Sequence, residues 1–381
     1  MPGVRVPAGI DVFSLAIDRM KKVYEEGHRV VVSFSAGKDS GVCLEICRIA
    51  ATETGRLPVE VLMRDEEIMF PGTYEYAERI AADPEIDFHW IYAEQPVLNV
   101  FNRAAPYFWV FDPTLDPDEW VRKPPDYAYK IEDKNIQAMV TPERFPPAPG
   151  KDLFAVVGLR TAESPNRAMG LFSSKGYLTK PNARGCRLAR PIYDWVDGDV
   201  WKAINDGGWD YNTAYNSMHR LGLPASQLRI APPTMAARAM DQLVVARKAW
   251  PQWFERVSNR LPGIRTAANF GRRAIEPRRN LGETWQETFE RECVSAAPAW
   301  IAERAAKVAS AAMRQHARHS TQPLPEKDPC YQCAGKTGAW RILVRNMYGG
   351  DPFAMKHSAL KYVEPEFFRE GAGIWGGSPS F

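Results

Sequence analysis

Near the start of the chain, a lysine, an aspartate and three serines lie within eight consecutive residues. The segment runs Ser33, Phe34, Ser35, Ala36, Gly37, Lys38, Asp39 and Ser40. Serine hydroxyls, the backbone N–H groups of a short turn and a lysine ammonium are all groups that bind phosphate. Gly37 has no Cβ, so a ligand can approach the backbone closely there. The segment therefore predicts a loop that holds a phosphorylated ligand.

The residues on either side predict that this loop joins a strand to a helix. The apolar, mostly β-branched run from Val30 to Phe34 is typical of a strand that is buried on both faces. Apolar residues then continue from Val42 to Ile49 among helix-compatible neighbours. The N-terminus of such a helix would add partial positive charge to that of Lys38.

The loop differs from a Walker A loop, whose pattern is G-x-x-x-x-G-K-[ST]. Here no glycine lies five residues before Gly37, and Asp39 follows the lysine. The pattern S-x-[GA]-G-K-D-S instead resembles the PP-loop of the ATP pyrophosphatase and phosphoadenosine phosphosulfate (PAPS) reductase superfamily, with Ala36 where glycine is commoner. The resemblance implies that the loop binds ATP or a PAPS-like adenine nucleotide, together with Mg²⁺. The alternative is an ordinary strand-to-helix turn.

A second charged group follows another predicted strand, Leu153 to Arg160. The residues Gly158-x-Arg160-x-x-Glu163-Ser164-x-x-Arg167 resemble the second signature of the PAPS reductase-like family. Guanidinium groups offer planar, two-pronged contacts to phosphate or sulfate. The resemblance therefore implies an anion site in which Arg160 acts in catalysis with Lys38 and Asp39. The alternative is a surface network of arginine and glutamate.

Acidic residues also end the predicted strand Pro58 to Asp65. Ligands of open parallel sheets bind at the carboxyl ends of the strands. We therefore expect Asp65 and Glu67 to hold Mg²⁺ or to contact a ribose, and Asp39 is a further candidate for Mg²⁺. The alternative is a solvated acidic loop.

The predicted fold is a five-stranded, mainly parallel, doubly wound α/β sheet of the adenine nucleotide alpha-hydrolase-like (HUP) kind. Residues 1–233 would form this domain, and the proline-rich stretch of about 95–151 would be an inserted cap. The elements Pro191-x-x-x-Trp195 and Tyr211-Asn212-x-x-Tyr215 resemble further elements of the superfamily. We expect Asp197 to cap a helix there, with Trp195 in the core.

Residues 234–381 predict a helical, basic C-terminal domain. Between residues 236 and 320 there are 15 Lys and Arg against 8 Asp and Glu. Such an excess can be a solvated helical surface or a face that binds DNA or RNA. The segment from Leu221 to Ile230 looks closer to proteins of phages, mobile elements and the immunoglobulin-binding regulator system, and it makes Arg229 a candidate anion ligand.

Two histidines and two cysteines late in the chain could form a tetrahedral zinc site. They are His316, His319, Cys330 and Cys333. An iron–sulfur cluster would need further thiolates, such as Cys186 and Cys293. The alternative is a set of reduced, buried cysteines.

The composition is that of an ordinary globular protein, with 45% hydrophobic and 25% charged residues among 381. No run of about 18 apolar residues occurs, and the start of the chain lacks a signal-peptide core. We therefore expect no membrane span and a cytoplasmic protein, in a phage-infected host cell if the subgroup resemblance holds. A homo-oligomer stays open.

The leading functional prediction is an enzyme that adenylates an acceptor and releases pyrophosphate, for sulfur transfer or nucleic-acid modification. A PAPS reductase is the first alternative, but such enzymes use a cysteine near the C-terminus, and no cysteine follows Cys333. The second alternative is a non-catalytic regulator that binds nucleotide and DNA.

Overall fold

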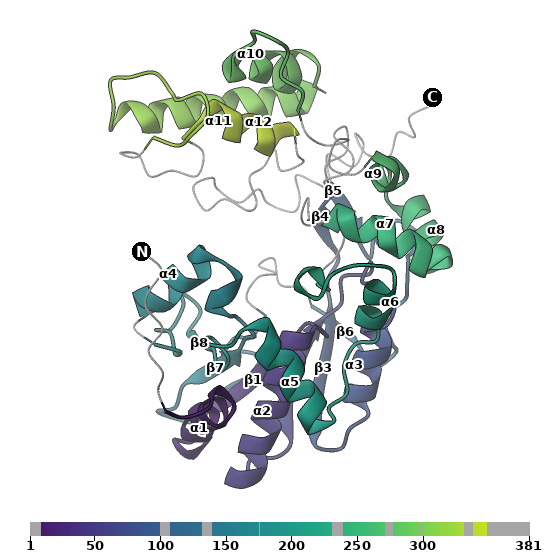
Figure 1. Cartoon of the computed structure of the whole chain (residues 1–381), viewed down its shortest axis with the longest axis vertical. Coiled ribbons are helices and arrows are strands. Elements are labelled where there is room, and N and C mark those ends of the chain that lie inside the picture. The colour runs from purple at the N-terminus through teal and green to yellow at the C-terminus, as the bar shows by residue number, and fades with distance from the viewer. Residues whose placement is uncertain are drawn as a thin grey trace. The chain divides into compact units, whose positions relative to one another are not determined.

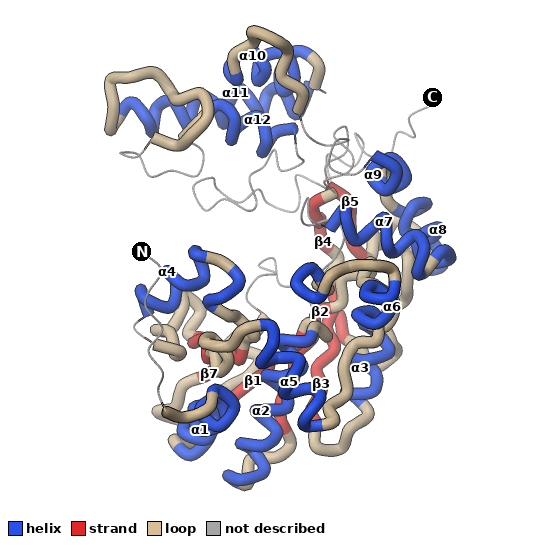
Figure 2. The backbone as a smooth tube through the Cα atoms, viewed as in Figure 1, coloured by secondary structure: helices blue, strands red, loops and turns tan. Residues whose placement is uncertain are grey.

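The computed structural model describes residues 9–99, 107–131, 139–174, 176–230, 239–270, 277–297, 299–330 and 338–348. The chain forms two compact units (Figure 1, Figure 2). One comprises Met1–Ala93 and Pro124–Ala231, and the other comprises Glu94–Lys123 and Pro232–Phe381. The first part of the predicted cap thus groups with the C-terminal region, whereas residues 124–151 belong to the first unit.

A six-stranded sheet forms the centre of the first unit, in the order β6-β3-β2-β1-β7-β8. All of its strand pairs are parallel. Its strands are β1 (Arg29–Phe34), β2 (Val59–Arg64), β3 (Ile86–Tyr92), β6 (Tyr129–Lys130), β7 (Leu153–Val156) and β8 (Cys186–Ala189). The prediction of five strands was wrong by one, because β6 has two residues and lies in a proline-rich segment without periodicity.

One face of the sheet packs against helices. The helices of this unit are α1 (Val12–Glu25), α2 (Lys38–Thr54), α3 (Thr73–Ala81), α4 (Pro165–Ser174), α5 (Asp197–Gly207) and α6 (Ala214–Arg220). Strand residues Val30, Val32 and Phe34 join residues of α1, α2, α3 and α5 in one hydrophobic core. Alternation along β1 sends these three side chains to the same face.

The opposite face is covered differently from the doubly wound prediction. Val31, Leu62 and Ile91 point to this face and pack with Val140 and Phe145. In the described part of the chain, this core consists of strand residues together with Ala93, Ile131, Met139, Val140 and Phe145, and it includes no helical residue. Met139, Val140 and Phe145, which lie in a segment of bends and a turn, therefore cover this face where a doubly wound sheet has a second helical layer.

Helix α2 carries the predicted phosphate loop at its N-terminus. It is buried along most of its length and is packed between the sheet and α1 and α5. The helix ends at Gly55, which has a φ of 66° and donates its N–H to the carbonyls of Ala51 and Thr52. A left-handed glycine is a common way to end a helix, because it lets the last carbonyls find donors.

The second unit contains a β-hairpin and helices, as predicted for its C-terminal part. Its elements are β4 (Gln95–Leu98), β5 (Tyr107–Val110), α7 (Ala239–Ala249), α8 (Pro251–Arg260), α9 (Ile264–Phe270), α10 (Trp285–Phe289), the π-helical η5 (Glu290–Ser295), α11 (Ala299–Ala317) and α12 (Trp340–Tyr348). Phe289, Cys293 and Trp340 share a core with residues of α11 and α12. None of the helices in the described ranges combines the length and apolar character that a bilayer span requires.

Candidate nucleotide site

The two sequence motifs follow neighbouring strands at the centre of the sheet. Strand β1 pairs with β2 on one side and with β7 on the other. The chain runs outward through β2 and β3 and then crosses to β7 and β8, so its direction across the sheet reverses next to β1 (Figure 1). Open parallel sheets bind ligands at the carboxyl ends of the strands at such a reversal. Both motif loops begin there.

The loop after β1 is held in shape by its own serines. The Ser40 hydroxyl donates to the carbonyl of Gly37 at 3.0 Å and accepts the N–H of Ser35 at 3.2 Å. The Ser35 hydroxyl lies 3.1 Å from that of Ser40. Ser33 lies within β1, upstream of the turn. These bonds give Ser35 and Ser40 a role in closing the turn. The sequence pattern predicted only a role in ligand binding for them.

Ala36, at the centre of the turn, has a φ of 54° and is fully buried. A left-handed backbone costs an alanine energy. Glycine would adopt this conformation without that cost. The turn tolerates alanine because neighbouring groups hold it in place.

Two of those groups come from the segment Tyr211–Tyr215. Its sequence pattern predicted the fold and no contact with the loop. The buried Asn212 side chain donates from Nδ2 to the carbonyl of Ala36 at 3.1 Å and to Thr73 Oγ1 at 3.0 Å. The Tyr215 hydroxyl accepts the backbone N–H of Lys38 at 2.9 Å. Burial raises the pKa of Tyr215, so this hydroxyl stays neutral.

Two cations at the motif loops share the same two carboxylates. Arg160 donates from Nε to Asp39 Oδ1 and from Nη2 to Asp197 Oδ1, both at 2.7 Å. Lys38 Nζ lies 3.1 Å from Asp39 Oδ2 and 3.4 Å from Asp197 Oδ1. The side chains of Arg160 and Lys38 are 2% and 5% exposed. The structure therefore brings together all three predicted catalytic residues and adds Asp197.

Asp197 differs from its expected role as a helix cap. Val196 is the capping residue, and Asp197 is the first residue of α5. Burial alone would raise the pKa of Asp197, but the charges of Arg160 and Lys38 outweigh it and lower this pKa. The side chain is 46% exposed, and it stays charged at neutral pH. The predicted core position of Trp195 is confirmed.

The remaining charges of the second motif extend this network. Glu163 Oε1 lies 3.7 Å from Arg160 Nη2, and Glu163 also pairs with Arg167. Burial, followed by the positive charge of Arg229, lowers the pKa of Arg167. The direction of this pKa shift is that of a guanidinium that is partly buried beside other positive charges.

Gly158 is required by close packing between the two loops. A Cβ on this residue would lie 2.8 Å from the backbone carbonyl carbon of Asp39 and 2.9 Å from its oxygen. These are backbone atoms at the start of α2, so they cannot swing aside as a flexible side chain can. The glycine of the second motif thus serves contact between protein segments, in addition to any approach of a ligand.

Asp65 has a structural role at the end of β2. Its carboxylate is 1% exposed and accepts from Trp90 Nε1 at 3.0 Å, the Tyr74 hydroxyl at 3.3 Å and the N–H of Glu67 at 2.9 Å. Glu67 is itself buried, with a φ of 59°. These bonds fix the turn, and the role of Asp65 as a Mg²⁺ or ribose ligand stays a prediction.

The zinc and iron–sulfur predictions concern residues in several places. His316 is buried in the second unit, and its Nε2 lies 3.0 Å from the carbonyl of Gln322. Cys333 lies outside the described residues. Within the described ranges, His316, His319 and Cys330 do not bring ligand atoms together. The two further thiols, Cys186 and Cys293, each lie in a hydrophobic core of a different unit. Both metal sites stay predictions.

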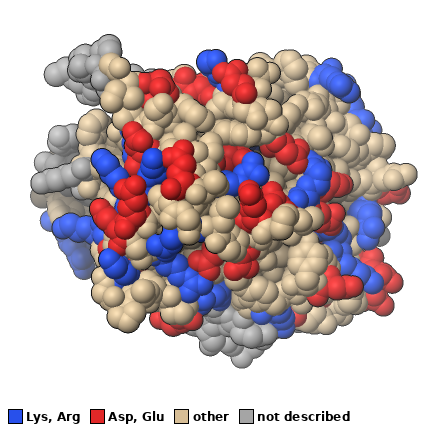
Figure 3. Space-filling view, turned by 90° about the horizontal axis from the view of Figure 1, so that it is seen from below, with Lys and Arg blue, Asp and Glu red and all other residues tan. Residues whose placement is uncertain are grey.

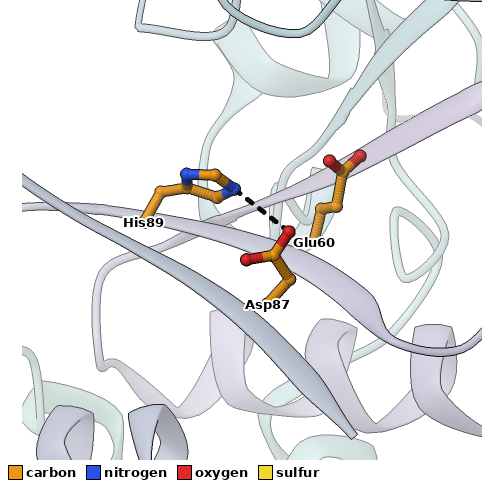
Figure 4. Close-up of side chains that lie close together, drawn as sticks. All are labelled: Glu60, Asp87 and His89. Atoms are coloured by element: carbon orange, nitrogen blue, oxygen red, sulfur yellow. Dashed lines mark ion pairs between the residues drawn. The ribbon is translucent and has the colours of Figure 1, made fainter.

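A cluster of possible metal ligands does occur near the amino ends of β2 and β3. Glu60, Asp87 and His89 each place a ligand atom within 4.8 Å of the others (Figure 4). His89 Nε2 lies 3.5 Å from Asp87 Oδ2. Glu60 is already held by the Arg29 guanidinium, with Nε donating to Oε2 at 2.8 Å and Nη2 to the other oxygen. The geometry is therefore accounted for by ion pairs.

Part of the basic excess of the C-terminal region is bonded within the second unit. Arg256 donates to the carbonyl of Trp120 at 2.9 Å, and Arg291 pairs with Glu283 at 2.7 Å. Figure 3 views the end of the first unit at which α1, α2 and α5 lie in Figure 1, and basic and acidic side chains are interspersed on that face too. The binding of DNA or RNA stays a prediction.

No protein-family model matches the chain. Over 250 residues the chain is 27% identical to the uncharacterized protein YbdN of Escherichia coli (strain K12). The match covers 60% of this chain and 60% of the length of that relative. The chain is also similar to the crystal structure of a PAPS reductase from Candida auris, with a TM-score of 0.32 and 12% identity over 60% of this chain and 97% of that one. It is similar as well to the FMN adenylyltransferase of Candida glabrata in complex with FMN and the ATP analog AMPCPP, with a TM-score of 0.35 and 11% identity over 56% of this chain and 65% of that one.

Proposed function

We infer that the protein binds ATP at the loop after β1 and catalyses attack of an acceptor on its α-phosphate, with release of pyrophosphate. One observation carries this inference. Two motif loops follow the neighbouring strands β1 and β7, at the point where the order of the strands reverses. The loops carry the buried cations Lys38 and Arg160. Buried cations beside a helix N-terminus are suited to stabilise charge on a phosphate group.

The chain's own groups can supply most of the catalysis by position and charge. The bond between the acceptor oxygen and the α-phosphorus forms as the bond from that phosphorus to the bridging oxygen of pyrophosphate breaks. Negative charge then grows on the leaving pyrophosphate, where Lys38 and Arg160 would stabilise it. Arg167 and Arg229 would contact the acceptor or a further anionic group of the nucleotide.

The donor set also fits a magnesium ion. Asp39 and Asp197 both reach the ammonium of Lys38, so two carboxylates converge on one positive charge. Mg²⁺ is a hard cation that binds through one or two carboxylates together with substrate phosphates. When bound, it would neutralise phosphate charge and help to orient the leaving group.

The test is the substitution Lys38→Ala, with Lys202→Ala as the matched control. Lys202 is an exposed lysine of α5 that pairs with Asp206. We expect Lys38→Ala to lower pyrophosphate release from ATP, with water as the acceptor, by at least about 100-fold, because it removes a preorganised charge. The control should release pyrophosphate as the wild type does. Wild-type release by a folded Lys38→Ala variant would contradict the inference.

A parallel assay separates this activity from that of a sulfonucleotide reductase. The protein is incubated with PAPS and a thiol reductant, and sulfite is measured. We expect no sulfite, because the proposed reaction is attack on the α-phosphate of ATP and reduces no sulfate group. Robust sulfite release would replace the proposed function with the reductase.

A further inference from the structure

The ion-pair network of the site, leaving Arg229 aside, carries as many carboxylates as cations. Ion pairs connect Lys38, Arg160 and Arg167 with Asp39, Asp197 and Glu163. The three positive and three negative charges cancel. A bare triphosphate would therefore gain little net attraction from this network, although each cation alone is suited to bind it.

The two central carboxylates differ in how firmly they are held. Asp39 lies in the first turn of α2, is 21% exposed and accepts from the Nε of Arg160. Asp197 is 46% exposed and contacts the cations from the solvent side of the network. Since Lys38 and Arg160 are almost fully buried, a phosphate oxygen reaches them most directly by taking the place of Asp197.

We propose that Asp197 is the displaceable counter-ion of this site, and that it makes the site select metal-complexed nucleotide over the metal-free form. The proposal rests on the proposed function and deepens it. A phosphate oxygen would replace the Asp197 carboxylate on Arg160 Nη2 and Lys38 Nζ. The freed carboxylate would then face the phosphates, where it repels a bare polyanion but favours one that carries a divalent cation.

The chemistry of the freed carboxylate supports this selectivity. A carboxylate without its cationic partners is an oxygen ligand of the kind that Mg²⁺ takes. The same displaced group that weakens binding of free ATP thus strengthens binding of the magnesium complex. Asp197 would be a positioning and selectivity residue, because it acts through the two cations and through the metal that accompanies the substrate.

The experiment compares the ATP dissociation constant in excess EDTA with that in excess Mg²⁺. The variants are Asp197→Asn and Asp197→Ser, and the control is Asp206→Asn. Asp206 lies on the same helix, is half exposed and pairs with Lys202, so its substitution changes the net charge by the same amount. Asp197→Ser removes the same charge with a smaller side chain, so a folding defect peculiar to one substitution would not appear in both. Thermal melting checks the fold of every variant.

We expect wild type and Asp206→Asn to bind ATP at least about tenfold more tightly with Mg²⁺. In both Asp197 variants, binding of metal-free ATP should tighten about tenfold, and the preference for Mg²⁺ should shrink accordingly. Folded variants that bind metal-free ATP no more tightly than the control would overturn the role of Asp197. If the wild type bound no ATP in either buffer, the proposed function itself would fail.

Discussion

Charged side chains gather at both ends of the central sheet, and the two clusters are built on different parts of the backbone. At the carboxyl ends, Lys38, Asp39 and Asp197 lie in the first turns of helices, and Arg160 follows β7 in a loop. At the amino ends, Glu60, Asp87 and His89 lie on the strands themselves (Figure 4). Both clusters contain carboxylates and a guanidinium, so side-chain chemistry alone does not distinguish them.

The backbone accounts for the difference. The N–H groups of strand residues are used in the hydrogen bonds of the sheet, and Glu60 and Asp87 both lie on paired strands. The first N–H groups of a helix have no partner within the helix, so they can bond to a side chain, as that of Lys38 does to the Tyr215 hydroxyl, or to a ligand. The comparison teaches that backbone donors and close glycine packing, more than a gathering of charges, mark the carboxyl-end cluster as the candidate site.

Among the substitutions that test this comparison, Gly158→Ala is expected to have the largest effect. The added Cβ would meet the Asp39 backbone at 2.8 Å, so we expect the free energy of unfolding to fall by about 1–3 kcal/mol. ATP binding should also be lost, because the two loops would be pushed apart. Urea unfolding and equilibrium binding measure the two effects.

Gly170→Ala is the matched control, since a Cβ on Gly170 meets no atom within 4 Å. Gly170 lies inside α4, where alanine is the better helix former, so this variant should gain about 0.5–1 kcal/mol. Equal stability and equal ATP binding in the two variants would show that the close approach of the loops is unimportant.

An intermediate effect is expected from Glu60→Gln in the amino-end cluster. The substitution removes the charge that pairs with Arg29, and both side chains are partly exposed. We expect the free energy of unfolding to fall by about 1 kcal/mol or less, since solvent screens such pairs. ATP affinity should stay at the wild-type value in a binding titration. A severalfold loss of affinity would mean that the amino-end cluster belongs to the site after all.

The smallest effect is expected from Ala36→Gly. Glycine relieves the cost of about 1 kcal/mol for a left-handed alanine, but it adds about 0.4–1 kcal/mol of chain entropy to the unfolded state. The variant should therefore unfold within about 1 kcal/mol of the wild type.

Ala50→Gly, inside α2, is the control and should lose about 1 kcal/mol, because no strain is relieved there. Urea unfolding compares the two variants. An equal loss in both would show that the turn at Ala36 stores no strain.

Local patterns were enough to predict the main strands and the two motif loops. Val30 to Phe34 and Gly158 to Arg160 could be recognised because strand burial and loop chemistry leave short, continuous signals. Asn212 and Tyr215 reach the loop from about 176 residues away along the chain, and no local pattern reveals such contacts. Asp65 was predicted as a ligand because the sequence shows where a carboxylate follows a strand. It does not show that Trp90 and Tyr74 donate to that carboxylate.

The second unit is assembled from two separate stretches of chain, Glu94–Lys123 and Pro232–Phe381, so a single cut in the chain does not isolate it. Asn99 donates from Nδ2 to the carbonyl of Pro262 at 3.2 Å, and Arg260 donates to the carbonyl of Trp109. A polypeptide cut after residue 231 would keep the hairpin strands β4 and β5 but lose the helical residues that bond to them. The first unit lies wholly within residues 1–231, but the second unit would be incomplete in both fragments. The contribution of the second unit is therefore better tested by point substitution than by truncation.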